Sequence, residues 1–68
     1  MPIDEMAIVE VLEDILGKGV KIGQVGTVVD ILGFEDAYLV EFSNDIGQTV
    51  ALVVLQPDQL KLYSSTSL

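Results

Sequence analysis

The stretch Gly23-Gln24-Val25-Gly26-Thr27-Val28-Val29-Asp30-Ile31 is the part of this sequence that decides the fold class. Its first glycine permits a turn, and its second glycine lies inside a run of β-branched residues. Glycine adopts backbone angles that other residues avoid, and its missing side chain lets another strand pass close by. Val, Thr and Ile suit a pleated, half-buried surface. The stretch therefore predicts the beginning of a strand in a small, sharply bent β-barrel.

Similar apolar runs on both sides predict further strands. The N-terminal run is ambiguous, because its apolar residues also fall at helical spacing, but the β-branched residues at its centre favour a strand over residues 7–12. Pro57 cannot donate to a strand ladder and is expected to begin one tight helical turn at residues 57–60. The other expected strands are 24–32, 37–42, 48–55 and 60–63.

Glycines and turn-forming residues separate these runs. Three glycines between residues 17 and 23 predict a loop over 13–23 that folds back on the barrel, with Ile15, Leu16 or Ile22 beneath it. Five short strands, one long loop and a single helical turn before the last strand predict an all-β fold, a small five-stranded SH3-like barrel. We expect one domain over residues 1–63 and a flexible tail over 64–68.

Strand alternation predicts which side chains face the core. The fourth expected strand is apolar on both faces, so one face is expected to line the barrel and the other needs a cover. That cover is either the 13–23 loop or another protein chain. The other chain would be a partner or a second copy. The predicted core is Val25, Val29, Tyr38, Val40, Phe42, Leu52 and Val54, and the predicted partner-binding residues are Leu39, Glu41, Val53 and Leu55.

The composition argues against most kinds of catalysis. The 68 residues include no His, no Cys and no Arg, and eleven acids stand against Lys18, Lys21 and Lys61, for a formal charge of −8. The acid pairs at 13–14 and 35–36 are expected to be solvated loop charges, so we predict no catalytic residue, no metal site and no cofactor. Affinity for nucleic acid rests mainly on Lys and Arg, so direct binding to nucleic acid is not expected.

Several short motifs along the chain resemble one family. In order they are Val-Leu-Glu-Asp (11–14), Gly-Gln-Val-Gly-Thr-Val-Val (23–29), Ala-Tyr-Leu-Val-Glu-Phe (37–42), Gly-Gln-Thr-Val-Ala-Leu (47–52) and Pro-Asp-Gln-Leu (57–60). Together they resemble a family of small bacterial proteins known as domain of unknown function 4926, over residues 7–62. The resemblance implies an SH3-like barrel and supplies no activity. The segment at 23–29 also resembles the KOW motif, whose barrels bind RNA or protein through basic and aromatic loop residues.

These observations predict a non-enzymatic protein-interaction module. An apolar patch rimmed by acids would face a protein partner, and the negative charge would suit a basic partner. One version is that this chain is an antitoxin or immunity protein that masks a basic nuclease. Solubilising charge is the more common explanation of such acids. The alternative is a KOW-like accessory module of nucleic-acid machinery. The lack of cysteine is compatible with a cytoplasmic protein, and no apolar run is long enough to span a membrane.

Overall fold

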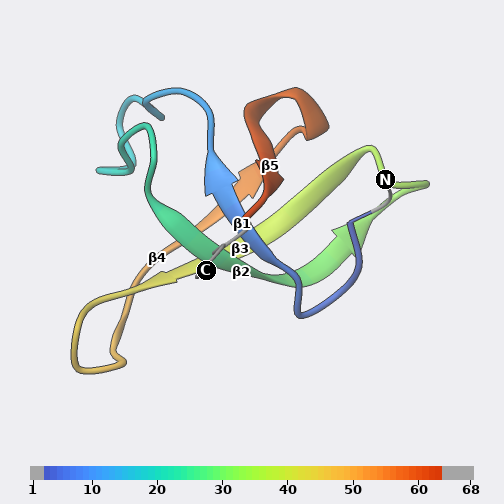
Figure 1. Cartoon of the computed structure of the whole chain (residues 1–68). Helices are drawn as coiled ribbons and strands as arrows, with labels where there is room; N and C mark the ends of the chain where they lie inside the picture. Colours follow the sequence, from blue (N-terminus) through green and yellow to red (C-terminus); the bar gives the residue numbers. More distant parts are fainter. Residues whose placement is uncertain (1–2, 64–68) are drawn as a thin grey trace, which may run out of the picture.

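Five antiparallel strands form one strongly bent sheet in the computed structural model, which describes residues 3–63. The strands are β1 (Ile8–Val11), β2 (Val25–Leu32), β3 (Ala37–Ser43), β4 (Thr49–Leu55) and β5 (Leu60–Leu62). Their order across the sheet is β4-β3-β2-β1-β5, so β1 lies between its sequence neighbour and the last strand. The β2–β3 and β3–β4 hairpins point toward opposite ends of the molecule (Figure 1).

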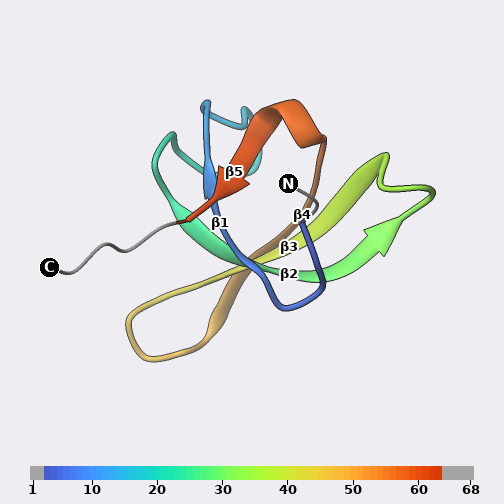
Figure 2. The ribbon, with the colours of Figure 1, turned by 45° about the vertical axis from the view of Figure 1, so that its right-hand side comes forward.

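The predicted fold class is confirmed. The N-terminal run is a strand, and one 3-10 turn, Pro57–Gln59, precedes β5. Figure 2 shows this turn leading directly into β5, which then lies alongside β1. The predicted strands agree with the observed bounds to within one or two residues. The predicted flexible tail at 64–68 lies outside the described residues.

Gly26 allows the closest approach inside the barrel. A Cβ atom at this position would lie 2.8 Å from two ring carbons of Phe42 and 2.8 Å from the carbonyl oxygen of Glu41. The Phe42 ring is fully buried and passes over the bare backbone of β2. Gly23 has a φ of 87°, in the left-handed region that favours glycine, and so permits the turn into β2. Both glycines therefore act as the sequence predicts.

Two β-bulges determine which side chains form the core. Ser43 pairs with Thr49, but Phe42 pairs with Ala51, so Val50 is an extra residue in β4. A shift of one residue exchanges the inner and outer faces of a strand. Val53 and Leu55 therefore join Tyr38, Val40 and Phe42 in the core. The prediction that Leu52 and Val54 are buried is wrong for this reason.

The second bulge lies in β2. Val28 pairs with Val40 and Asp30 pairs with Leu39, so Val29 has no opposite residue. Val28 is fully buried, whereas Val29 is only partly buried and Val25 is exposed. The predicted burial of Val25 and Val29 is therefore wrong, while that of Tyr38, Val40 and Phe42 is confirmed.

The loop between β1 and β2 folds back on the barrel through two apolar residues. The backbone of Ile15 bridges to Val20, and Val20 is buried in the core while Ile15 packs against it. Leu16 and Ile22 are exposed, so of the three residues predicted to lie beneath the loop only Ile15 does so. The Ile22 amide donates to Asp14 Oδ1 at 2.8 Å, which ties the two ends of the loop together.

Candidate protein-interaction site

The outer surface of β3 and β4 carries four neighbouring apolar side chains, which we call the β4 face: Leu39, Val50, Leu52 and Val54. Leu52 is 56% exposed and Val54 is 55% exposed. Leu39 lies opposite Val54 in the ladder, so their side chains are neighbours on the same face. Antiparallel sheets with one solvated face usually place polar residues there. An apolar outer face of this kind is typical of an interaction surface.

Two carboxylates border this surface. Glu41 lies opposite Leu52, and its carboxylate accepts a hydrogen bond from the Thr49 hydroxyl. Asp30 lies opposite Leu39 on the other side of β3, and its Oδ1 accepts the Ile31 amide at 2.8 Å. These hydrogen bonds orient both acids beside the β4 face. The site is thus an apolar patch with a negatively charged border.

The structure separates the four residues predicted to bind a partner. Leu39 and Glu41 lie on the outer side of the sheet and are partly exposed. Val53 is 4% exposed and Leu55 is fully buried, so the expectation that they form the exposed surface is wrong. The bulge at Val50 turns these two side chains inward and turns Leu52 and Val54 outward. Their alternation along β4 was visible in the sequence, but the bulge that selects the outer set was not.

The loop between β1 and β2 does not cover the β4 face. Its inward-facing residues, Ile15 and Val20, pack on the core instead. Leu52 and Val54 stay more than half exposed with the loop in place. Of the two covers considered from the sequence, the loop is therefore not the cover of this face.

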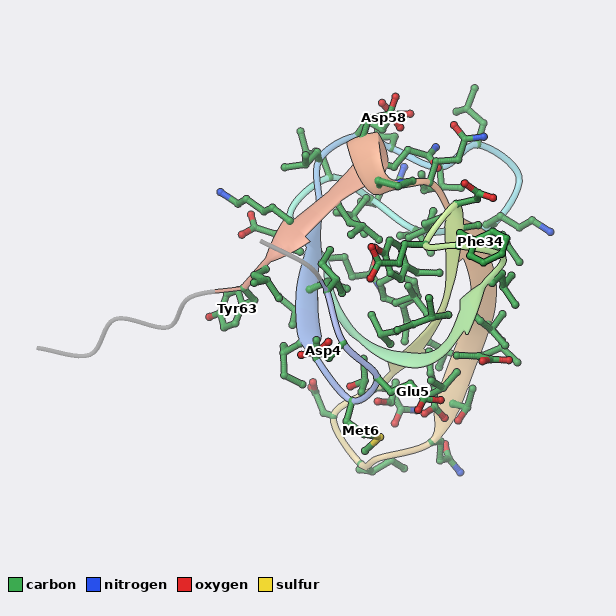
Figure 3. The ribbon with its side chains drawn as sticks, turned by 90° about the vertical axis from the view of Figure 1, so that its right-hand side faces the viewer. Asp4, Glu5, Met6, Phe34, Asp58 and Tyr63 are labelled. Atoms are coloured by element: carbon green, nitrogen blue, oxygen red, sulfur yellow. The ribbon has the colours of Figure 1, made fainter. Side chains whose placement is uncertain are left out.

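The acidic side chains are spread over the molecule. Asp4 and Glu5 lie near one end and Asp58 lies near the other (Figure 3). The Glu13 carboxylate accepts a hydrogen bond from the side-chain amide of Gln59 at 3.3 Å. The Asp14 carboxylate accepts one from the backbone amide of Ile22 in the same loop. Among residues 3–63 no three acids come together in a way that could hold a metal ion.

The exposed aromatic side chains do not form a common platform. Phe34, which is 97% exposed, and Tyr63 lie on opposite sides of the molecule (Figure 3). Tyr38 and Phe42 are core residues. Proteins that bind single-stranded nucleic acid combine neighbouring exposed aromatics with basic residues. In the described part of the chain Phe34 and Tyr63 are not neighbours (Figure 3), and Lys61 forms an exposed ion pair with Glu10 at 3.9 Å.

One open hollow of about 400 Å³ lies between the N-terminal segment and the last strand. It is lined by Ile3, Tyr38, Pro57, Leu60, Lys61 and Leu62. Its lining contains no carboxylate, and its apolar side chains belong largely to the core. The titratable side chains of its lining are Tyr38 and Lys61. Within residues 3–63 no helix is long and apolar enough to cross a membrane.

Comparison with known proteins gives one match. The sequence model of the family described as "Domain of unknown function (DUF4926)" matches residues 5–62. No curated protein and no solved structure matches the chain. The match covers every strand, so the β4 face and both bulges lie within the shared domain.

Proposed function

The chain belongs to the DUF4926 family, and we propose that it is a protein-interaction module whose β4 face binds a basic protein partner. One observation carries this proposal: Val50, Leu52 and Val54 present apolar side chains to solvent along a whole strand. Removing such a surface from water stabilises a complex by roughly 25 cal/mol for each Å² of apolar area. The isolated domain, whose β4 face stays in contact with water, lacks this stabilisation.

The charge of the domain indicates the kind of partner. The formal charge is −8, and Glu41 and Asp30 border the β4 face directly. Acids around an apolar patch attract a positively charged protein and orient it during the encounter. The same acids repel nucleic acid and other acidic proteins. A small basic enzyme whose site is masked by this domain, as in an antitoxin or immunity pair, would fit this combination.

The test introduces a charge on the apolar face and uses a matched control. Leu39→Asp places a carboxylate on the β4 face beside Val54, and Leu16→Asp makes the same change on the exposed β1–β2 loop. Partners captured from the source cell by the wild-type domain are purified, and the affinity of each variant is measured by calorimetry. We expect Leu39→Asp to weaken binding at least tenfold, which is about 1.4 kcal/mol. Leu16→Asp should bind as the wild type does.

Circular dichroism should show both variants folded, because both positions are solvent-accessible. Binding should also weaken as salt rises, mainly through a slower association rate. If Leu39→Asp binds the partner as tightly as the wild type, the β4 face is not the binding surface. If the affinity is independent of salt, the acids serve solubility alone.

The KOW-like alternative has weaker support from the geometry. It would require RNA or an RNA-bound protein to meet basic and aromatic loop residues. Lys18 and Lys21 lie in the β1–β2 loop, while Phe34 lies at the tip of the β2–β3 hairpin. Titration of a single-stranded RNA at low salt separates the two functions. Saturable binding with a steep salt dependence would favour the alternative.

A further inference from the structure

Strand β4 is a free edge of the sheet. Within residues 3–63 it pairs with β3 alone, and β3 occupies one side of it. The backbone groups on its other side are available to another chain, since an edge strand presents a row of unpaired N–H and C=O groups. Which residues carry those groups follows from the hydrogen bonds elsewhere in the sheet.

The hydrogen bonds of Val28 indicate how the backbone groups are oriented in residues 51–55, the regular part of β4. The Val28 amide donates to the Ala7 carbonyl at 2.9 Å, and its carbonyl accepts from the Met6 amide at 2.7 Å. The N–H and C=O groups of Val28 therefore point away from β3. Val40 lies opposite Val28, so the N–H and C=O groups of Val40 point toward β4. Val40 and its partner Val53 are thus a hydrogen-bonded pair. Because the two kinds of pair alternate, the N–H and C=O of Leu52 and Val54 point out of the free edge.

This edge lacks the usual protection against pairing. Natural edge strands are kept apart by charged side chains, proline, short length or bulges. No residue from Ile46 to Gln56 is charged, and β4 contains no proline. The bulge at Val50 bends one end of the strand and leaves residues 51–55 regular. The regular part is the part that carries the outward groups of Leu52 and Val54.

We propose that this edge pairs antiparallel with the same edge of a second copy of the chain. The two-fold axis passes between the two Val53 residues, so Leu52 of each copy forms a hydrogen-bonded pair with Val54 of the other. This register uses all the outward groups of the regular segment and leaves the bulge outside the contact. The sheet then continues from one copy into the next, and the two β4 faces join into one larger surface.

The lack of charge along residues 46–56 makes this edge the place where a second copy can approach. Two chains of charge −8 repel each other at most approaches. The uncharged segment 46–56 is where two copies can meet without placing carboxylates directly against each other along the strands. The self-complementary register makes the contact isologous, which is the form that closes a dimer. The contact is small, in the class below about 1,200 Å² that holds weak and reversible complexes.

The edge contact uses the backbone groups of Leu52 and Val54, whereas partner binding uses the side chains of the β4 face, so a variant off the edge is needed to separate the two proposals. Val54→Pro removes one outward N–H and no bond to β3, so the barrel keeps its ladder. Val54→Thr is the matched control, since it keeps the N–H and a β-branched side chain. Sedimentation velocity of the full chain, up to about 1 mM, follows the monomer–dimer equilibrium expected for a weak contact.

We expect the wild type and Val54→Thr to shift from monomer to dimer as concentration rises. Val54→Pro should have a dissociation constant at least tenfold higher. Amide exchange of the wild type gives a second readout that needs no variant: Leu52 and Val54 should become protected as concentration rises, and Val53 should not change. Higher salt should strengthen the dimer, whereas it should weaken binding to a basic partner.

A wild type that stays monomeric throughout this range would overturn the proposal. Equal dimerisation of Val54→Pro, or concentration-independent exchange at Leu52 and Val54, would also overturn it. The Leu39→Asp variant separates the two proposals, since it lies off the edge and should still dimerise while losing the partner. Val54→Pro should be monomeric, and because Val54 also belongs to the β4 face this variant reports on the dimer alone.

Discussion

Replacing Gly26 with alanine should destabilise the barrel through a single steric contact. The added Cβ would lie 2.8 Å from the Phe42 ring and from the Glu41 carbonyl oxygen, well inside van der Waals contact. Phe42 is fully buried, and the carbonyl belongs to the β3 backbone, so neither can move without disturbing the core. Overpacking of this kind costs about 1–3 kcal/mol. The lower chain entropy of alanine in a strand offsets roughly 0.5–1 kcal/mol of that cost.

The two terms leave a net loss of about 0–2.5 kcal/mol, and a loss in the middle of that range, about 1–2 kcal/mol, is large for this protein. A 68-residue domain has a free energy of unfolding of about 3–10 kcal/mol. For domains of this size, 1 kcal/mol corresponds to a shift in Tm of roughly 4–8 °C. Thermal unfolding followed by circular dichroism should therefore show Gly26→Ala melting about 5–15 °C below the wild type.

A double substitution identifies Phe42 as the cause. Leucine at position 42 removes ring atoms that the new Cβ would meet, so the cost of Gly26→Ala plus Phe42→Leu should fall short of the sum by at least about 0.5 kcal/mol. Gly17→Ala is the control, because its Cβ meets no atom within 4 Å and its cost comes from a φ of 80°. In the double variant, the free-energy costs of Gly17→Ala and Phe42→Leu should simply add. A Tm for Gly26→Ala within about 1 °C of the wild type would refute the packing argument.

Two further predictions concern the strand register and a strained turn. Val53→Asp should unfold the domain at room temperature, because it places a carboxylate in the core, whereas Val54→Asp should leave its circular dichroism spectrum unchanged. The opposite result would show that the Val50 bulge is misplaced. Glu35 has a φ of 67°, and Asn tolerates this region better, so Glu35→Asn should stabilise the domain by up to about 1 kcal/mol in urea unfolding. A fall in the denaturation midpoint would contradict this reasoning.

The positions of the strands could be predicted because each depends on local signals. Gly23 marks the turn before β2, Pro57 ends β4, and β-branched runs lie between them. The family resemblance rests on the same local motifs and is confirmed by the match over residues 5–62. The close packing at Gly26 was also predictable, since a glycine inside a β-branched run indicates that another group passes near.

The orientation of β4 could not be predicted, because both of its faces are apolar. Without the bulge, the pairing of Ser43 with Thr49 would continue to Phe42 with Val50 and would bury Leu52 and Val54. With the bulge, the same hairpin buries Val53 and Leu55 instead. No residue type marks Val50 as the extra residue. The candidate site therefore shifted by one residue along β4, while Leu39 and Glu41 in β3 kept their predicted face.

The pairing of β1 with both β2 and β5 has a consequence for how the chain reaches its native state. Val9 pairs with Leu62 and Val11 with Leu60, so two of the fully buried residues near the start of the chain are enclosed by its last strand. During synthesis the hairpins of β2, β3 and β4 can form early, but β1 stays without its second neighbour until residue 62 has left the ribosome. Folds that depend on such distant contacts close slowly, in about a millisecond to a second. Until then Val9 and Val11 are open to solvent, and the nascent domain has exposed strands that a chaperone or another chain can bind.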